Sequence, residues 1–233
     1  DFEQFRDRLP WIWQSPQAVE PPKVQNPAWP TDPIDRFVLQ KLEGGQLRPA
    51  EPANDRRWMR RAHFAITGLP PKPEDVQAFL KDPSKDRKRT LVGNLLDSPH
   101  YGERWARHWM DLVRYAESRG HEGDAILPNA YRYRDYLVRA FNADLPYDAL
   151  VKEHLAGDLL ETPRRHPETG ANESILATAW PFFGEENSTA VDLRLDECDR
   201  IDNKVDVLSK AFLGLTVACA RCHDHKFDAI RQS

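Results

Sequence analysis

A row of residues near the C-terminus recurs at alternating spacings of three and four. Such spacings place every member on one face of an α-helix, because a helical turn takes 3.6 residues. The row therefore predicts one long helix over residues 190–218, whose single buried face leads directly into a pair of cysteines. Its members are Cys198, Ile201, Val205, Leu208, Phe212, Leu215 and Cys219. On this face, Cys198 is predicted to be a buried free thiol.

Helix signals also recur upstream of this row. Asp32 and Ser98 are helix-capping residues, and each is followed by a proline at the first helical position. No stretch alternates with the period of two that a half-buried strand requires. The sequence therefore predicts an all-α fold, an irregular multi-helix domain. The upstream helical segments are predicted within residues 32–45, 54–68, 72–80, 84–98, 98–118, 128–141, 147–160 and 171–183.

The N-terminal part of the chain differs from the rest in composition. It is rich in proline and lacks helical periodicity, which predicts an extended arm over residues 1–32. Residues 33–233 are predicted to form the helical domain. Because the chain begins without a methionine and ends close to its densest motif, we interpret it as a piece of a longer protein.

Charge and hydropathy exclude two classes of partner. Acidic residues number 37 and basic residues 33, a net charge of −4, whereas a protein that binds nucleic acid concentrates basic charge on one face. No window approaches the roughly 18 consecutive apolar residues of a membrane span. An acidic row on the last predicted helix is interpreted as a solvated face. It comprises Asp196, Asp199, Asp202 and Asp206.

The last predicted helix leads into the pentapeptide CARCH, Cys219 to His223. Three chemistries use a Cys-x-x-Cys pair. A thioredoxin-type disulfide lies at the start of a helix that follows a strand, not at the end of a helix. A structural zinc site needs four ligands, and no second pair of Cys or His stands at finger-like spacing. Covalent c-type haem requires Cys-x-x-Cys-His, with both thiols on the porphyrin vinyl groups and the histidine on the iron.

The pentapeptide matches this last pattern at every position. It predicts haem c attached at Cys219 and Cys222, at the C-terminal end of the long helix, with His223 as the metal ligand. Asp224 and His225 lie too near the attachment turn to reach the opposite face of a haem. We expect them to fix the loop or to hydrogen-bond His223, whose imidazole needs an acceptor.

Several blocks of the sequence together resemble a known family. They are DPIDRFVLQKLE, ITGLPPKPEDVQAFL, SPHYGERWARHWMDLVRYAES, AYRYRDYLVRAFNADLPYD, EHLAGDLL and LGLTVACARCHDHKFD. From Pro33 to Ile230 the chain is similar to the planctomycete cytochrome-C-type domain, a domain of unknown function. It departs from that family in KFDAI, where the family usually has proline in place of the alanine.

This resemblance implies a secreted protein, located in the periplasm or elsewhere outside the cytoplasm. It implies a small cytochrome c domain before this module on the same polypeptide and a further conserved domain after it. Genes of the family frequently lie near genes for sulfatases and polysaccharide breakdown, which implies carbohydrate as a partner or substrate. The resemblance implies a haem, but no established reaction.

Only ten residues follow His223, so a sixth ligand of the iron is expected to come from upstream in the chain, from its C-terminal remainder or from a partner, or to be absent. Within 98–118, a polar row at spacings of four, three and four flanks a predicted buried row of Tyr101, Trp105, Trp109, Leu112 and Ala116. The polar row supplies the catalytic candidates His108, Asp111, Arg104 and Tyr115. His108 is predicted as distal ligand or acid–base group, oriented by Asp111. The alternative is an exposed histidine with helical ion pairs nearby.

Two arginines of segment 128–141 complete the predicted site. Arg132 and Arg134 are candidate counter-charges for haem propionates, and ordinary surface arginines are the alternative.

These observations predict an extracytoplasmic mono-haem c-type cytochrome module of a larger secreted oxidoreductase. Its expected partners are a redox partner protein and the C-terminal remainder of the same protein. Two alternatives stay open. One is a pure electron-transfer cytochrome without substrate, and the other is a structural module held together by haem, or by zinc at Cys219, Cys222 and His223.

Overall fold

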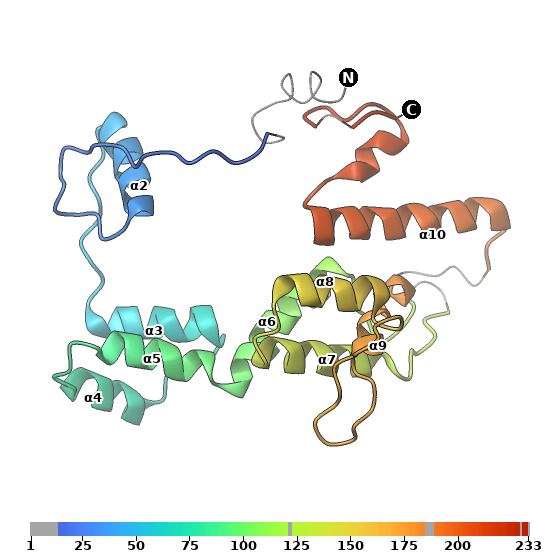
Figure 1. Cartoon of the computed structure of the whole chain (residues 1–233), viewed down its shortest axis with the longest axis horizontal. Coiled ribbons are helices and arrows are strands. Elements are labelled where there is room, and N and C mark those ends of the chain that lie inside the picture. The colour runs from blue at the N-terminus through green and yellow to red at the C-terminus, as the bar shows by residue number, and fades with distance from the viewer. Residues whose placement is uncertain (1–13, 121–122, 185–188, 229, 233) are drawn as a thin grey trace. The chain divides into compact units, whose positions relative to one another are not determined.

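The computed structural model describes residues 14–120, 123–184, 189–228 and 230–232. In these residues the regular structure is helical; no strand is present, and two isolated bridges join single residue pairs. The predicted all-α, irregular multi-helix class is therefore confirmed (Figure 1). The chain divides into two compact units, Asp1–Asn54 and Asp55–Ser233.

The first unit contains α2 (Pro33–Gly44). The Asp32 side chain caps this helix by accepting from two backbone N–H groups of its first turn, as its position before a proline predicts. Leu39 is the buried residue of the helix.

The proline-rich residues before α2 belong to the same unit. Residues 14–32 form no helix or strand, and the Glu43 carboxylate accepts from the backbone N–H of Gln25 at 3.0 Å. This bond ties the extended residues to α2. Residues 1–13 of the predicted arm lie outside the described residues. The boundary between the two units follows Asn54, whereas the predicted division lay before residue 33.

The second unit begins with three helices, α3 (Asp55–Ile66), α4 (Pro73–Lys81) and α5 (Arg87–Leu96). They pack around a small apolar core of Met59, Val76 and Phe79. The Asp55 carboxylate forms ion pairs with Arg87 and Lys88, which connect the start of α3 to the first turn of α5.

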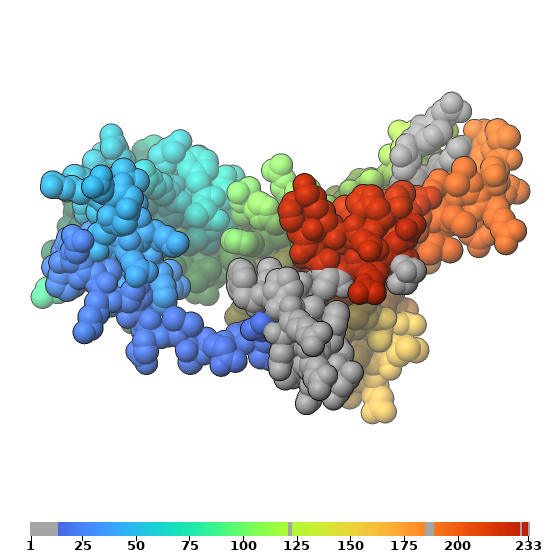
Figure 2. Space-filling view, turned by 90° about the horizontal axis from the view of Figure 1, so that it is seen from above, coloured from blue at the N-terminus to red at the C-terminus, as the bar shows by residue number. Residues whose placement is uncertain are grey.

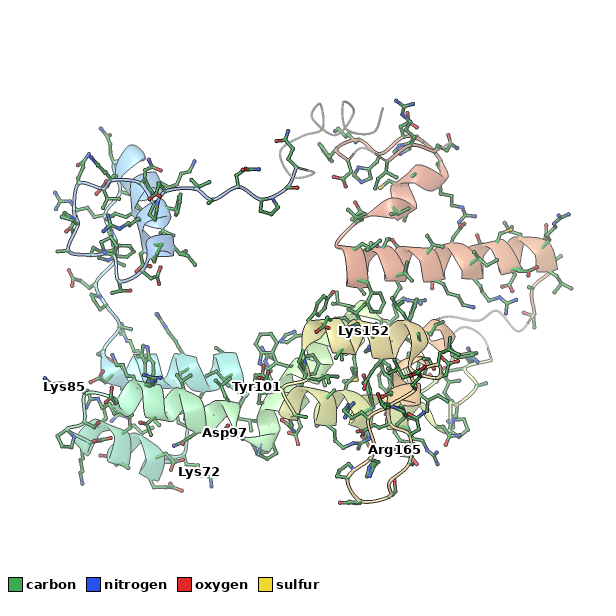
Figure 3. All side chains as sticks on the ribbon, in the orientation of Figure 1. Lys72, Lys85, Asp97, Tyr101, Lys152 and Arg165 are labelled. Carbon is green, nitrogen blue, oxygen red and sulfur yellow. The ribbon has the colours of Figure 1, made fainter. Side chains whose placement is uncertain are left out.

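A larger core lies among the helices that follow. They are α6 (Pro99–Leu112), α7 (Ala130–Asn142), α8 (Tyr147–Ala156), the short α9 (Ser174–Ala177) and the 3-10 turn η2 (Trp180–Phe182). Figure 3 shows side chains crowded between α7, α8 and α9, whereas Lys72 and Lys85 project outward from the three-helix part. The buried centre contains aromatic and aliphatic side chains of α6, α7, α8, α9 and η2, together with Val207 and Ala211 from the C-terminal part of the chain.

The buried face of α6 differs from the predicted one. Gly102 and Ala106 are buried together with Trp109, whereas Trp105 and Leu112 of the predicted row are exposed, so the prediction is wrong for these two. The reason is the close approach of α7. A Cβ on Gly102 would lie 2.4 Å from a carbonyl oxygen of α7, so the helices meet where α6 has its smallest residues.

The predicted helix over 190–218 is interrupted. α10 (Leu193–Leu208) continues as the π-helical turn η3 (Ser209–Leu213), which ends at Gly214. The 3-10 helix η4 (Val217–Arg221) follows and contacts α10. Figure 1 shows this last part of the chain, in red, folded back over α10.

The predicted single buried face of this helix is therefore wrong. Val207 and Ala211 enter the core, but Cys198, Ile201 and Val205 are exposed, so Cys198 is a free thiol at the surface. The π-helical turn holds one residue more than an α-helical turn and rotates the following residues relative to the preceding ones. Residues before and after η3 therefore do not share one face. Within α10 itself, the buried Val207 lies on the side opposite the exposed Val205.

Candidate functional site

The Cys-x-x-Cys-His motif lies at the surface. Gly214 has a φ of 66°, a left-handed conformation that glycine adopts without strain, and it redirects the chain from η3 toward η4. Cys219 lies in η4 and Cys222 directly after it, with the Cys222 N–H 3.4 Å from the Cys219 carbonyl oxygen. Both thiols are free and exposed. Figure 2 shows this C-terminal part, in red, on the outside of the molecule.

Among the described residues, His223 has a hydrogen-bond partner at one ring nitrogen and none at the other. Its Nδ1 lies 2.8 Å from the backbone carbonyl oxygen of Asp224. Because a carbonyl oxygen can only accept, Nδ1 carries the proton and donates it to this bond. The other nitrogen, Nε2, retains its lone pair on an exposed side chain. Histidines that ligate metals are oriented by the same kind of bond from the second ring nitrogen.

His225 has both ring nitrogens engaged, on a side chain that is 6% exposed. Nδ1 accepts from the backbone N–H groups of Phe227 and Asp228 at 3.1 and 2.8 Å. Nε2 therefore carries the proton and donates to Thr216 Oγ1 at 2.8 Å. The expectation that His225 fixes the loop is confirmed. Asp224 bonds His223 through its backbone carbonyl rather than through its carboxylate.

The acidic row of α10, predicted as a solvated face, is paired with basic side chains. Arg221, between the two cysteines, donates from Nη2 to Asp199 at 2.7 Å and from Nε to Asp202 at 2.8 Å. The other pairs are Asp196–Arg200 at 3.1 Å and Asp206–Lys210 at 2.7 Å. The prediction missed these partners because Arg221 comes from a different element, brought back onto α10 by the turn at Gly214.

A groove of about 560 Å³ lies between α10 and the motif segment. Carboxylates of the acidic row line one wall, and small apolar residues of η4 line the other. Large apolar side chains before and after the motif are also open to solvent: Val205 is 46% exposed, Leu213 62% and Phe227 76%. A groove of this size with mixed walls lies in the range of small-ligand pockets.

The chemistry of these residues fits a c-type haem. Two accessible thiols three positions apart precede an imidazole whose Nε2 is free, and apolar surface lies nearby. Within the described ranges, no three His, Cys, Asp or Glu side chains form a group that could hold a metal ion by themselves. A haem requires no such group, because porphyrin nitrogens provide four of the iron's ligands.

The predicted catalytic residues of α6 have different neighbours. His108 is exposed, and its ring stands edge-on to Trp105 at 5.5 Å. Asp111 is also exposed, whereas Arg104 packs against Gly68 in the turn before α4. Among the described contacts, none joins His108 to Asp111 or Arg104. The structure therefore places these three on one helix without bringing their functional groups together.

Tyr115 and the two predicted propionate arginines lie near the start of α7. The Tyr115 hydroxyl donates to Glu117 at 2.8 Å, and burial together with this bond raises the pKa of Tyr115. Arg134 pairs with the same Glu117 at 2.8 Å and with Asp135 at 3.0 Å, so its charge is matched within the protein. Arg132 is exposed and has no ion pair in the part of the chain that the structure describes.

His154 is a buried histidine at the centre of the large core, outside the predicted site. Its Nδ1 donates to the Leu150 carbonyl at 2.7 Å, and its Nε2 accepts from Trp109 Nε1 at 3.0 Å and from the Tyr133 hydroxyl at 2.9 Å. Burial lowers its pKa to about 4, which keeps the ring neutral. The sequence signal was its place on an apolar helix, four residues after Leu150.

Two buried glutamates lie beside this histidine. Glu153 accepts from the Tyr136 hydroxyl at 2.6 Å and from Ser174 Oγ at 2.7 Å, and Arg164 pairs with both Glu153 and Glu173. Desolvation acts to raise the pKa of Glu153, but these hydrogen bonds outweigh it and lower the pKa. Because each carboxylate has partners, the network joins α8, α9 and the loop between them.

None of the described helices is both long and apolar enough to cross a bilayer.

Comparison with known proteins yields a family match alone. No curated protein and no solved structure matches the chain. The family model PSCyt2, described as a protein of unknown function (DUF1549), matches residues 33–233, from α2 to the end of the chain. Apart from Asp32, the matched range contains the sequence blocks of the resemblance, and it includes the Cys-x-x-Cys-His motif. The chain therefore belongs to the PSCyt2 family of proteins of unknown function.

Proposed function

We propose that this protein is a mono-haem c-type cytochrome module, with haem c attached at Cys219 and Cys222 and with His223 as iron ligand. The observation that carries the proposal is the hydrogen bond from His223 Nδ1 to the Asp224 carbonyl. It leaves Nε2 free for a metal on the residue that directly follows two accessible thiols. The described residues thus include both attachment thiols and the histidine that would ligate the iron on one side.

The protein's part in this chemistry is attachment and orientation. Each thiol would add its sulfur and its hydrogen across one vinyl group, which forms a thioether without a leaving group and without a net oxidation. The Asp224 carbonyl orients the His223 ring, and His225 holds the loop behind it. When bound, the haem supplies an iron that cycles between two oxidation states.

We further propose that the module lies outside the cytoplasm and belongs to a larger secreted oxidoreductase. The family resemblance supports this location and the presence of further domains. The gene neighbourhood of the family supports carbohydrate as the class of substrate.

The test is export of the full chain in a host with cytochrome c maturation. The intact mass is expected to exceed that of the polypeptide by one haem, and acid acetone is expected to leave the haem attached. Cys219→Ser with Cys222→Ser is expected to abolish the added mass, whereas Cys198→Ser, the matched exposed cysteine, is expected to keep it. A colourless protein containing zinc would contradict the proposal.

The distal side of the iron separates an enzyme from an electron carrier. We propose an enzyme, in which His108 would act beside the bound haem as an acid–base group rather than as an iron ligand. Carbon monoxide is then expected to bind readily, and His108→Ala is expected to alter that binding while the resting spectrum stays the same. A change to a high-spin spectrum in His108→Ala would indicate a carrier with His108 as ligand. If His108→Ala changes neither carbon monoxide binding nor the resting spectrum, His108 has no role at the distal side of the haem.

A further inference from the structure

Arg221 lies inside the motif, at the second position between the two cysteines, and it forms two ion pairs with α10. Its Nη2 donates to Asp199 at 2.7 Å and its Nε to Asp202 at 2.8 Å. The two acids stand three residues apart and hence on one face of the helix. A guanidinium that donates from two nitrogens to two carboxylates is fixed in direction as well as in position.

Apolar packing contributes little to holding the segment that carries the motif, which follows η3. From Leu213 onward, none of the described residues belongs to the buried core, and a groove of about 560 Å³ lies between part of η4 and α10. The segment therefore does not enter the core of its unit. Its position on α10 depends on polar contacts, and the two ion pairs of Arg221 are the ones that join the motif itself to the helix.

The chain after the motif is in turn tied to Arg221. The Gln232 side chain donates to the Arg221 carbonyl at 3.2 Å, and the Gln232 backbone N–H donates to the Asp224 carboxylate at 3.0 Å. His225 closes the loop between them. The motif and its return loop thus form one small folded segment, and Arg221 connects that segment to α10.

We propose that Arg221 is a positioning residue for haem attachment. Its ion pairs with Asp199 and Asp202 hold the motif against α10 while the thiols of Cys219 and Cys222 stay exposed. This inference rests on the proposed function, and it assigns a role to a position that the attachment pattern leaves open. The acidic row of α10 then acts as the support of the motif.

The first experiment uses the unloaded full chain, produced without haem attachment. Arg221→Asp places a third carboxylate beside Asp199 and Asp202, and hydrogen exchange of the amides of 217–222 is expected to become about tenfold faster. Adding Asp199→Arg to this variant restores one opposite-charge pair and is expected to reverse most of the effect. Arg231→Gln is the matched control, because Arg231 lines the same groove without a described ion pair.

The second experiment measures the fraction of exported protein that carries covalent haem, from its intact mass. Arg221→Asp is expected to lower this fraction severalfold, the charge-swapped pair to restore it, and Arg231→Gln to leave it at the wild-type level. Normal loading of Arg221→Asp would overturn the inference and leave the proposed function intact. A wild-type chain that takes up no haem would overturn both. Failure of the charge swap to restore loading, with Arg221→Asp impaired, would also overturn the inference.

Discussion

At the scale of single residues, two histidines near the C-terminus are distinguished by their ring hydrogen bonds. His223 bonds a carbonyl through Nδ1 and leaves Nε2 free, whereas His225 uses one nitrogen as acceptor and the other as donor. An imidazole with both nitrogens engaged cannot ligate a metal unless the loop around it opens. The two histidines therefore differ in which ring nitrogens are engaged, although they are two positions apart.

Substitution of each histidine tests this distinction. His223→Ala is expected to keep the covalent haem, because the thiols are untouched, and to lose the ordinary spectrum of the histidine-ligated iron. His225→Ala is expected to keep the ligand but to speed hydrogen exchange at Phe227 and Asp228, whose N–H groups lose their acceptor. Intact mass reports the covalent haem, the visible spectrum reports the iron ligand, and mass spectrometry of hydrogen exchange reports the loop, so the three measurements distinguish the two variants. A wild-type spectrum in His223→Ala would refute its role as ligand.

The buried His154 makes stability depend on pH. Its pKa falls from 6.5 to about 4 on folding, so the unfolded chain binds a proton between these values that the folded chain does not bind. Stability from this group is therefore complete above about pH 6.5 and is lost as pH falls to 4, by at most about 3 kcal/mol. Urea unfolding of wild type and of His154→Gln is the measurement. The free energy of unfolding of the variant is expected to change less with pH between 6.5 and 4 than that of wild type. The same change in both proteins would contradict the assignment.

At the scale of secondary-structure elements, small residues decide how helices meet. Gly102 of α6 lies against the Val138 carbonyl of α7, where a methyl group has no room. Gly93 of α5 has no neighbouring heavy atom within 4 Å of the place where its Cβ would stand. The two glycines therefore differ in their surroundings, whereas each lowers the stability of its helix by the same backbone entropy.

This difference predicts opposite effects of one substitution. Gly102→Ala is expected to destabilise the protein by about 1–3 kcal/mol, because α7 must move away. Gly93→Ala is expected to stabilise it by up to about 1 kcal/mol, since alanine favours a helix interior over glycine. Denaturant unfolding curves of the two variants provide the comparison. Equal effects of both substitutions would show that α6 and α7 are not in close contact at Gly102.

At the scale of the whole molecule, the two units have separate interiors. The two apolar cores and the buried glutamate network lie within Asp55–Ser233, while α2 and the proline-rich residues before it form the other unit. The motif lies in the second unit, together with the helix that supports it.

This division predicts that the second unit is sufficient for folding and for haem attachment. A chain of residues 55–233 is expected to retain its helical circular dichroism and to unfold within about 3 °C of the chain 33–233, because no core residue of the second unit is removed. It is also expected to take up covalent haem when exported. Loss of the helical circular dichroism, or loss of haem uptake, in 55–233 but not in 33–233 would show that the second unit needs α2 for folding or for haem attachment.

The sequence by itself determined the features that depend on neighbours along the chain. Asp32 and Ser98 marked helix starts, since a cap and the following proline act within one turn. The absence of alternation indicated a helical fold, and five consecutive residues supplied the Cys-x-x-Cys-His pattern on which the proposed haem attachment is based. Family membership over residues 33–233 likewise follows from the sequence alone.

The tertiary structure alone decided which faces are buried and which charges are paired. Spacing placed Ile201 and Val205 on a buried row, but the face of α10 that reaches the core carries Val207, two positions and so more than half a turn away from Val205. The Arg221 partners lie 22 and 19 positions earlier in the chain, and no local pattern connects them. His154 likewise owes its neutral state to rings from α6 and α7. Burial and ion pairing depend on contacts between segments that are distant in sequence. The periodicity of one segment carries no information about those contacts.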